Sequence, residues 1–325
     1  MNELQRRFIN QYQGGFPVVE HPYSTVAAYL GTDETTLISA IQGLLDEGIL
    51  SRFGPLYDAS SIGGGLTLAA MSVPEDEFDC VVDLINELPE VAHNYRREHT
   101  LNMWFVIATE TPELLHKAIA KIEKLAELPV YNFPKIQTFY LGLWLLLDKD
   151  GRVTTRSIEQ LPSQSRMTIG QLDRDIIHAT QGGLALHPTP YDEVAKQCGC
   201  DTQTVMNRMQ CMLDSGVIRR ISAVPNHYRL GLRSNGMSVW DVADERLDEL
   251  GKQVGQLEFV SHCYERPRHL PQWSYNLYAM VHGSDQDEVN YKVNQIAELL
   301  GDDCQQHDVL LSSKILKKSG LRLVA

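Results

Sequence analysis

The sequence has few of the features that mark a secreted, membrane-bound or metal-binding protein. Its most apolar run, at 141–147, is far shorter than the roughly 20 residues of a membrane-spanning helix. The amino-terminal residues lack the apolar core and the small-residue cleavage site of a signal peptide. The six cysteines are scattered, with no CxxC pair and no Cys/His cluster at zinc spacing. We therefore expect a cytoplasmic protein with no membrane association, reduced thiols and no protein-bound metal.

Positive charge is also scarce. The chain of 325 residues has 29 Lys and Arg against 42 Asp and Glu, which gives a formal net charge of -13. Such a charge opposes broad association with a phosphate backbone. With 43% hydrophobic residues and no low-complexity run, the composition is that of a globular protein, and the length suggests two or more domains.

What the sequence does contain is an internal repeat. QGGFPVVEHPYSTVAAYLG and QGGLALHPTPYDEVAKQCG begin at positions 13 and 181, an offset of 168 residues. Later matches drift from that offset, which places insertions in the second copy. The matched pairs are Arg52 with Arg220 (offset 168), Tyr95 with Tyr264 (169) and Asn102 with Asn276 (174). Two homologous halves follow, each of about 150 residues.

Each half opens with a helix-turn-helix pattern. Segment 33–48 begins at Asp33, a residue type that caps helices, places its apolar residues on one face and ends at Gly48. Its counterpart, 201–216, carries a methionine stripe on the same face, which we interpret as core. A short wing follows each of these helices. The helices expected before them are 2–12, 24–30, 169–180 and 191–198.

The rest of each half alternates strands and helices in the order β-α-β-β-α-β, which is typical of a ferredoxin-like domain. A final strand is expected near 130–142 in the first half and at 304–316 in the second. The fold class is therefore α+β, with two repeats of a helix-turn-helix unit and a ferredoxin-like domain. The expected boundaries are 1–60 and 167–228 for the helix-turn-helix units, 61–147 and 229–325 for the α/β domains, and 148–166 for a polar linker.

This plan resembles the Lrp/AsnC transcription regulators, so DNA binding is one hypothesis. From 33 to 50, where a recognition helix needs hydrogen-bond donors and cations, there is no Lys or Arg but four acidic residues. The second copy offers only Arg208, Arg219 and Arg220. DNA binding is therefore the weaker alternative.

Three other motifs point to a different family. They are YRREHTLNMWF at 95–105, RRISAVPNHYRLGLRSNGMSVWDV at 219–242 and HCYERPRHLPQWSYNLYAMVHG at 262–283. They resemble the siroheme decarboxylases, whose two related subunits share the Lrp/AsnC-like architecture. Motifs of both subunit types occur in this chain, which looks like the fused form associated with haem d1 formation.

The resemblance implies removal of CO2 from two acetate side chains of siroheme, giving didecarboxysiroheme in haem d1 or alternative haem biosynthesis. It implies no added cofactor, because the substrate carries the iron. Siroheme is rich in carboxylates, for which Arg97 and Arg266 are the leading ligands and Arg96 and Arg268 weaker ones. A tetrapyrrole-binding module without chemistry is a further alternative.

Loss of CO2 leaves carbanion character, so an acid must deliver a proton, a role that suits histidine. The candidates are His99 and His227, followed by His262 and His282, and one of them could instead ligate the siroheme iron. The remaining expected substrate contacts are Tyr95, Tyr264, Trp104, Trp273, Asn102 and Asn276. The two Trp could equally be core residues, and His262 could serve the fold alone.

The two halves differ at two of these histidines. The repeat places Ala59 opposite His227 and Ala108 opposite His282. We therefore expect either one pocket to which the halves contribute unequally, or one competent and one decayed pocket, where the two sheets face each other as an intrachain pseudo-dimer. Arg97, His99 and His227 are expected to complete the wall that segment 262–283 forms. Further association, as a homo-oligomer or with related decarboxylase subunits, is also compatible with the plan.

Overall fold

A computed structural model of the protein describes residues 1–58, 61–156 and 167–318. The chain divides into two compact units. The helical unit comprises Met1–Ile62 and Trp144–Gly231, and the sheet unit comprises Gly63–Leu143 and Leu232–Ala325. Each unit therefore takes one part from each half of the repeat. No helix in the described ranges is long and apolar enough to cross a membrane.

The helical unit contains both helix-turn-helix copies. Their helices are α1 (Glu3–Tyr12), α2 (Pro22–Leu30), α3 (Glu34–Asp46), α6 (Gln171–Thr180), α7 (Pro190–Cys198) and α8 (Thr202–Asp214). The side chains of Asp33 and Asp201 cap α3 and α8 by accepting a backbone N–H, as their sequence positions predict. Two buried tyrosines join the copies reciprocally: Tyr23 donates to the carbonyl of Ala185, and Tyr191 to that of Pro17.

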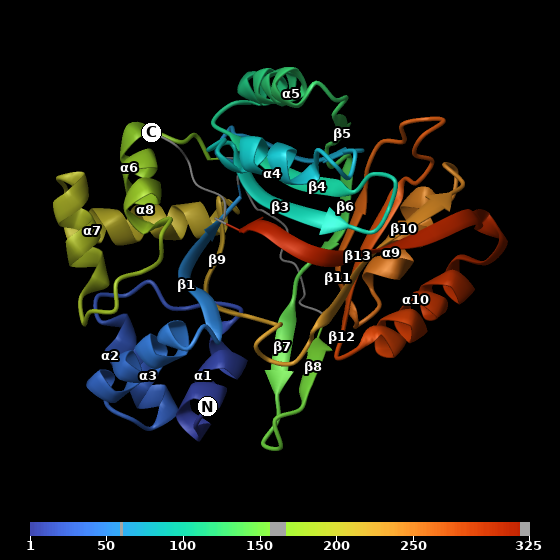
Figure 1. Ribbon diagram of the computed structural model, residues 1–325. Helices are drawn as coiled ribbons and strands as arrows, with labels where there is room; N and C mark the ends of the chain where they lie inside the picture. The colour runs from blue at the N-terminus through green and yellow to red at the C-terminus, as the bar shows by residue number, and fades with distance from the viewer. Residues whose placement is uncertain (59–60, 157–166, 319–325) are drawn as a thin grey trace. The chain divides into compact units, whose positions relative to one another are not determined.

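The two predicted wings pair with each other. Strand β1 (Leu50–Tyr57) lies antiparallel to β9 (Ile218–Pro225), so that Gly54 is opposite Ser222. Because the strands run in opposite directions, the helices that precede them lie at opposite ends of this ribbon (Figure 1). The repeat thus forms a pseudo-symmetric pair within the helical unit.

The expected linker at 148–166 begins inside a hairpin. Strand β7 (Trp144–Leu147) pairs with β8 (Val153–Arg156), and the Asp148 carboxylate closes the turn by accepting the backbone N–H of Arg152. Polar residues with a glycine suit a hairpin turn as well as a linker, and here Gly151 has a positive φ of 82°. Residues 157–166 lie outside the described ranges.

Nine of the described strands form one sheet, in the order β5-β2-β4-β3-β13-β10-β12-β11-β6. The first half supplies β2 (Gly65–Met71), β3 (Val91–Arg97), β4 (Met103–Thr109), β5 (Tyr131–Phe133) and β6 (Gln137–Leu141), with helices α4 (Phe78–Asn86) and α5 (Pro112–Ala126). The second supplies β10 (Ser234–Val242), β11 (Val260–Glu265), β12 (Leu277–Gly283) and β13 (Cys304–Lys318), with α9 (Leu247–Gly255), α10 (Gln286–Leu300) and the short η1 (Gly301–Asp303). These elements confirm the predicted ferredoxin-like plan.

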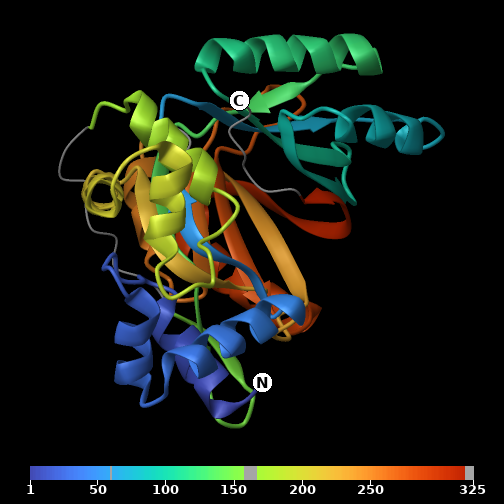
Figure 2. The same cartoon turned by 90° about the vertical axis from the view of Figure 1, so that its left-hand side faces the viewer.

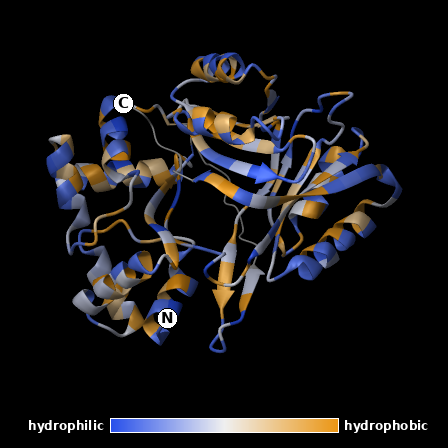
Figure 3. Ribbon diagram, viewed as in Figure 1, coloured by the Kyte–Doolittle hydropathy of each residue, from blue (hydrophilic) through white to orange (hydrophobic). Residues whose placement is uncertain are grey.

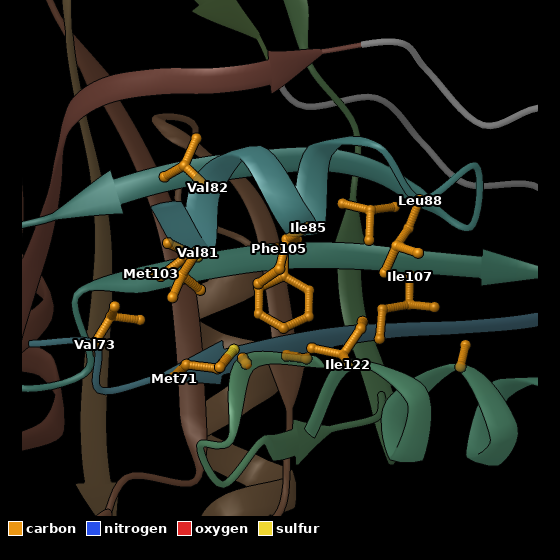
Figure 4. Close-up of a cluster of buried hydrophobic side chains, with 14 of the residues drawn as sticks. Met71, Val73, Val81, Val82, Ile85, Leu88, Met103, Phe105, Ile107 and Ile122 are labelled. Carbon is orange, nitrogen blue, oxygen red and sulfur yellow. The ribbon is translucent and has the colours of Figure 1, made fainter. Parts of the chain in front are cut away.

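Helices cover one face of each half. In the first half, α4 and α5 lie on the same side of the strands (Figure 2) and bury apolar side chains against them, as Figure 4 shows for Val81, Phe105 and Ile122. In the second half, α9 and α10 bury Leu250, Val293 and their neighbours in the same way. Hydrophobic and hydrophilic residues alternate around α5 and α10 (Figure 3), as expected for helices with one buried face.

The expected single final strand of the first half is wrong, because residues 130–142 form two strands with different partners. Strand β5 pairs with β2 of its own half, whereas β6 pairs with β11 of the second half. Pro134, which has no backbone N–H, separates them. Strand β13 makes the equivalent exchange without a break: Leu310 is opposite Met237 in β10, and Ile315 is opposite Tyr95 in β3.

Candidate active site

A buried aromatic cluster joins the two halves of the sheet unit on the face away from the helices. We call it the central cluster, and it consists of Ala70, Leu101, Trp104, Phe133, Met237, Val239, Trp273, Tyr278 and Leu310. The Trp104 and Trp273 rings lie 5.1 Å apart, and both residues are at most 1% exposed. At these residues the halves are therefore in contact, where the sequence led us to expect a pocket. A substrate would reach either Trp only where the cluster opened.

Arg97 and Arg266 form a reciprocal pair of contacts across the halves. Both guanidinium groups are buried, and each donates through Nη1 to a backbone carbonyl of the other half, Arg97 to Leu310 and Arg266 to Phe133. Their backbone contacts are also equivalent. The N–H of Arg97 donates to the carbonyl of Asn102, and that of Arg266 donates to the carbonyl of Asn276. The Tyr95 and Tyr264 rings lie 5.9 and 5.2 Å from the respective guanidinium carbons.

Arg266 is a buried cation without a carboxylate partner among the described residues. Its guanidinium lies over the rings of Tyr264 and Tyr278, and its Nε has no hydrogen-bond partner in the described part of the chain. Burial lowers the pKa of Arg266, and the two tyrosines oppose that effect. A buried charge that lacks a counter-ion is costly, so this arrangement suits an anionic ligand. The nearby Arg268, in contrast, pairs with Asp241 and Asp244.

The predicted asparagines form matching contacts with the backbone. The Asn102 side chain accepts the N–H of Val73 and donates to its carbonyl, and Asn276 does the same with Val242. Asn102 therefore ties the loop before β4 to the residues that follow β2, and Asn276 ties the loop before β12 to the end of β10. Substrate contact by these amides remains a prediction.

His99 lies in the loop between β3 and β4 and faces the second half. Its ring is 5.3 Å from that of Trp273, Nδ1 accepts the N–H of Leu101, and Nε2 is 3.6 Å from the Asp308 carboxylate. Burial lowers the pKa of His99, and Asp308 opposes that shift. The accepted hydrogen bond places the proton of the neutral ring on Nε2.

Sequence reasoning missed His269, which occupies the corresponding place in the second half. Its Nε2 donates to the carbonyl of Asn132, 2.8 Å away, and its ring lies 4.8 Å from that of Phe133. Two backbone hydrogen bonds between His269 and Trp273 close the inserted loop in which both residues lie. The signal was present in the motif 262–283, but the insertion moves His269 out of register with His99.

His262 and His282 come together through a residue that the sequence did not single out. The Ser261 hydroxyl lies 2.8 Å from His262 Nδ1 and 2.7 Å from His282 Nε2. On its other side, His282 Nδ1 bonds the Asn235 side-chain oxygen, and His282 is only 4% exposed.

The other predicted residues are dispersed. His227 follows β9 in the helical unit, with its ring 4.3 Å from that of Tyr228, and its matched residue Ala59 lies outside the described ranges. Its place in the pocket wall remains a prediction. Arg96 pairs with Glu75 on the surface.

The helical unit also contains an open cavity of about 520 Å³. Its lining includes the aromatic residues Tyr12, Phe16 and Tyr29, together with Arg219 and Arg220. Gly14 and Gly15 of the QGG repeat also line it. That repeat aligns the two halves of the sequence, and its motif alone did not predict a site.

Comparison with known proteins identifies the family. The model of the AsnC-like ligand binding domain matches residues 63–140 and 229–317, and that of the siroheme decarboxylase NirDL-like HTH domain matches 5–50 and 173–219. A siroheme decarboxylase from Hydrogenobacter thermophilus is 30% identical over 311 residues, which are 94% of this chain and 90% of that protein. The chain belongs to the siroheme decarboxylase family.

Two further comparisons place it within the siroheme decarboxylases. The siroheme decarboxylase NirH subunit of Pseudomonas aeruginosa is 56% identical over 152 residues, which are 47% of this chain and 89% of that subunit. A crystal structure of the siroheme decarboxylase NirDL in complex with an iron-uroporphyrin III analogue superposes with a TM-score of 0.72 at 25% identity, covering 99% of this chain and 93% of that one. The predicted family and fold are therefore confirmed.

Proposed function

We propose that this chain removes CO2 from two acetate side chains of siroheme, giving didecarboxysiroheme for haem d1 formation, with no cofactor beyond the iron that siroheme carries. The observation that carries the proposal is the similarity to a siroheme decarboxylase along almost the whole of both chains. The substrate is a flat macrocycle that bears many carboxylates. The site must therefore offer buried cations and a proton donor.

Arg266 is the carboxylate ligand that the contacts favour. A guanidinium has five N–H donors, and the hydrogen bond to Phe133 uses only one nitrogen. Its burial without a carboxylate partner among the described residues supports binding of an anion. We assign Arg97 the equivalent role in the first half, on the strength of its matched contacts.

His99 is the proton donor that we propose for the first half. Its ring contacts Trp273, a residue of the central cluster. The Asp308 carboxylate is close enough to stabilise the protonated form of His99. His262 and His282 take part in the second half.

The test is anaerobic incubation of the purified protein with siroheme, followed by mass spectrometry of the tetrapyrrole. We expect a product lighter by two CO2, and we expect Arg266→Met and His99→Ala to suppress it. Arg96→Ala removes the neighbouring surface arginine and serves as the matched control. An absorption shift of siroheme without loss of mass would contradict the proposal and indicate a binding module. Salt-dependent binding of a preferred DNA duplex, with siroheme unchanged, would indicate a regulator.

A further inference from the structure

The second half of the sheet unit contains a chain of four hydrogen-bonded side chains on three adjacent strands. Asn235 in β10 lies directly opposite His282 in β12 and bonds its Nδ1. His282 Nε2 lies 2.7 Å from the Ser261 hydroxyl in β11, which lies 2.8 Å from His262 Nδ1. We call this chain the Asn-His-Ser-His relay.

A β-bulge makes the relay geometrically possible. Successive side chains of a regular strand point to opposite faces, which would separate Ser261 from His262. The pairing of β11 with β12 shifts register between Val260 and His262, and Val260 and Cys263 both pack in the core under the helices. The extra residue therefore lets Ser261 and His262 share one hydrogen bond while their neighbours keep the core intact.

The first half has the same bulge but not the relay. Its register shift lies between Val91 and His93, which matches that of the second half. Ala92 stands at the position of Ser261, and Leu66 and Ala108, which face each other in β2 and β4, stand at those of Asn235 and His282. Only the histidine pair, His93 and His262, is common to both halves. The difference is therefore confined to three side chains on a shared backbone.

The donors and acceptors of the relay determine where its protons lie. The Asn235 amide oxygen can only accept, so His282 carries its proton on Nδ1 and presents Nε2 as an acceptor. Ser261 has one hydroxyl proton, and His282 Nε2 at 2.7 Å is a nearer acceptor than the Met280 carbonyl at 3.4 Å. With that proton donated to His282, the Ser261 oxygen accepts from His262 Nδ1. The relay therefore holds neutral His262 with its proton on Nδ1 and its lone pair on Nε2.

We propose that Asn235, His282 and Ser261 are positioning residues that prepare His262 to deliver a proton from Nε2 during decarboxylation in the second half. The inference rests on the proposed function. In the step, the bond between the acetate methylene and carboxylate carbons breaks, CO2 leaves, and the electron pair stays on the methylene carbon. Protonated His262 gives its Nε2 proton to that carbon to form the methyl group, and a solvent proton later restores it. The tautomer that remains after donation is the one that the relay stabilises.

The tautomer can be measured without substrate. In protein labelled with 15N in the histidine rings, NMR should show His262 and His282 of the unaltered chain with Nδ1 protonated. In Ser261→Ala, His262 should shift towards protonation on Nε2, whereas Ser261→Thr, which keeps the hydroxyl, should preserve the original signal. Protonation of His262 on Nε2 in the unaltered protein would overturn the relay.

Steady-state kinetics test the role of the relay in decarboxylation. We expect Ser261→Ala to lower kcat for CO2 release by roughly tenfold to a hundredfold with little change in KM, because general acid catalysis contributes about 10²–10⁴-fold. Asn235→Leu, which introduces the residue of the first half, should act in the same direction, and Ser261→Thr should restore most of the rate. Ala92→Ser, at the matched position of the first half, is the control.

A kcat of Ser261→Ala within twofold of the unaltered rate would overturn the inference and leave the proposed function standing. Failure of the unaltered protein to release CO2 would instead remove the proposed function.

Discussion

The two halves of the sheet unit share their backbone contacts and differ in their side-chain chemistry. Arg97 and Arg266 bind matching carbonyls across the halves, and Asn102 and Asn276 bind matching backbone groups within them. The relay, in contrast, exists only in the second half.

The comparison separates two kinds of constraint. A side chain that bonds the backbone helps to hold the geometry of the fold, so it must be present wherever that geometry is repeated. The shortest hydrogen bonds of Asn235, His282 and Ser261 go to other side chains, and Leu66, Ala108 and Ala92 occupy the matched positions of the first half with the same strand pairing. Function can therefore become unequal between the halves while the fold stays symmetric.

The largest effect is expected at the paired arginines. Arg266→Met should lower kcat/KM for siroheme by about 10- to 150-fold, because a hydrogen bond to a charged group contributes roughly 1.5–3 kcal/mol. The free energy of unfolding should change little, because the variant removes a buried cation without a counter-ion among the described residues but also removes the hydrogen bond to the Phe133 carbonyl, and the two effects oppose each other. Urea titration and steady-state kinetics measure both. Arg97→Met tests whether the halves contribute equally, and a kcat/KM of Arg266→Met within threefold of the unaltered value would contradict the assignment.

The exchanged strand β6 offers a second test. Gly251 and Gly255 in α9 pack against Phe139 and Tyr140, where α4 of the first half has Val82 and Asn86. A methyl group at Gly251 would lie 2.5 Å from Phe139 Cζ, so Gly251→Ala should lower the free energy of unfolding by about 1–3 kcal/mol.

Gly43→Ala in α3 is the control for that variant, because the added carbon meets only Gln5, at 3.6 Å. Ala favours a helix interior by about 0.5–1 kcal/mol over Gly, so this variant should be neutral or more stable in urea denaturation. Equal effects of the two substitutions would show that the close packing of Phe139 is not limiting.

A smaller effect is expected in the central cluster. Trp273 Nε1 donates to the buried Tyr278 hydroxyl at 2.7 Å, whereas Trp104 donates to the carbonyl of Leu101 within its own half. Tyr278→Phe should therefore cost about 1–2 kcal/mol of stability by leaving a buried donor without its acceptor. Tyr275→Phe, which alters a partly exposed ring beside Trp273, should change stability by no more than about 0.5 kcal/mol. Equal losses of stability in Tyr278→Phe and Tyr275→Phe would show that the hydrogen bond from Trp273 does not account for the effect.

The smallest effect concerns pH. Burial lowers the pKa of His99 in the folded chain, so its contribution to stability is present above the ordinary histidine pKa of about 6.5 and is lost as the pH falls through that range. The melting temperature of His99→Gln should fall less than that of the unaltered protein between about pH 7.5 and pH 5.5. His116→Gln, at an exposed position in α5, is the control. Identical pH dependence in both variants would show that His99 does not carry the effect.

The sequence predicted the fold because its signals are local. Helix caps such as Asp33 and Asp201 and the repeated order of elements are written within short windows. The partner of β6 was not predictable, because pairing of Gln137–Leu141 with β11 depends on contacts more than 100 residues away along the chain. Pro134 indicated a break but not where the chain would go next.

The sequence indicated candidate residues of the site, but it did not indicate which of their neighbours they would contact. Arg97, Arg266 and His99 were proposed from their recurrence beside tyrosine, and each contacts a residue of the central cluster, Leu310, Phe133 and Trp273 respectively. Their roles toward a substrate stay predictions. Ser261 and Asn235 escaped notice because they are common residue types, and only the bulge and the strand register bring them to His282. The burial of Trp104 and Trp273 likewise follows from how the halves pack together.

The exchanged strands also bear on the order in which the chain acquires its structure during synthesis. Residues 93–97 in β3 emerge from the ribosome more than 200 residues before their partners in β13. Until then, β3 is an open sheet edge that can pair with a similar edge on another nascent chain. Contacts of such long sequence separation also fold slowly. A single gene for both halves keeps the two edges on one molecule, which raises their effective concentration and favours the correct pairing.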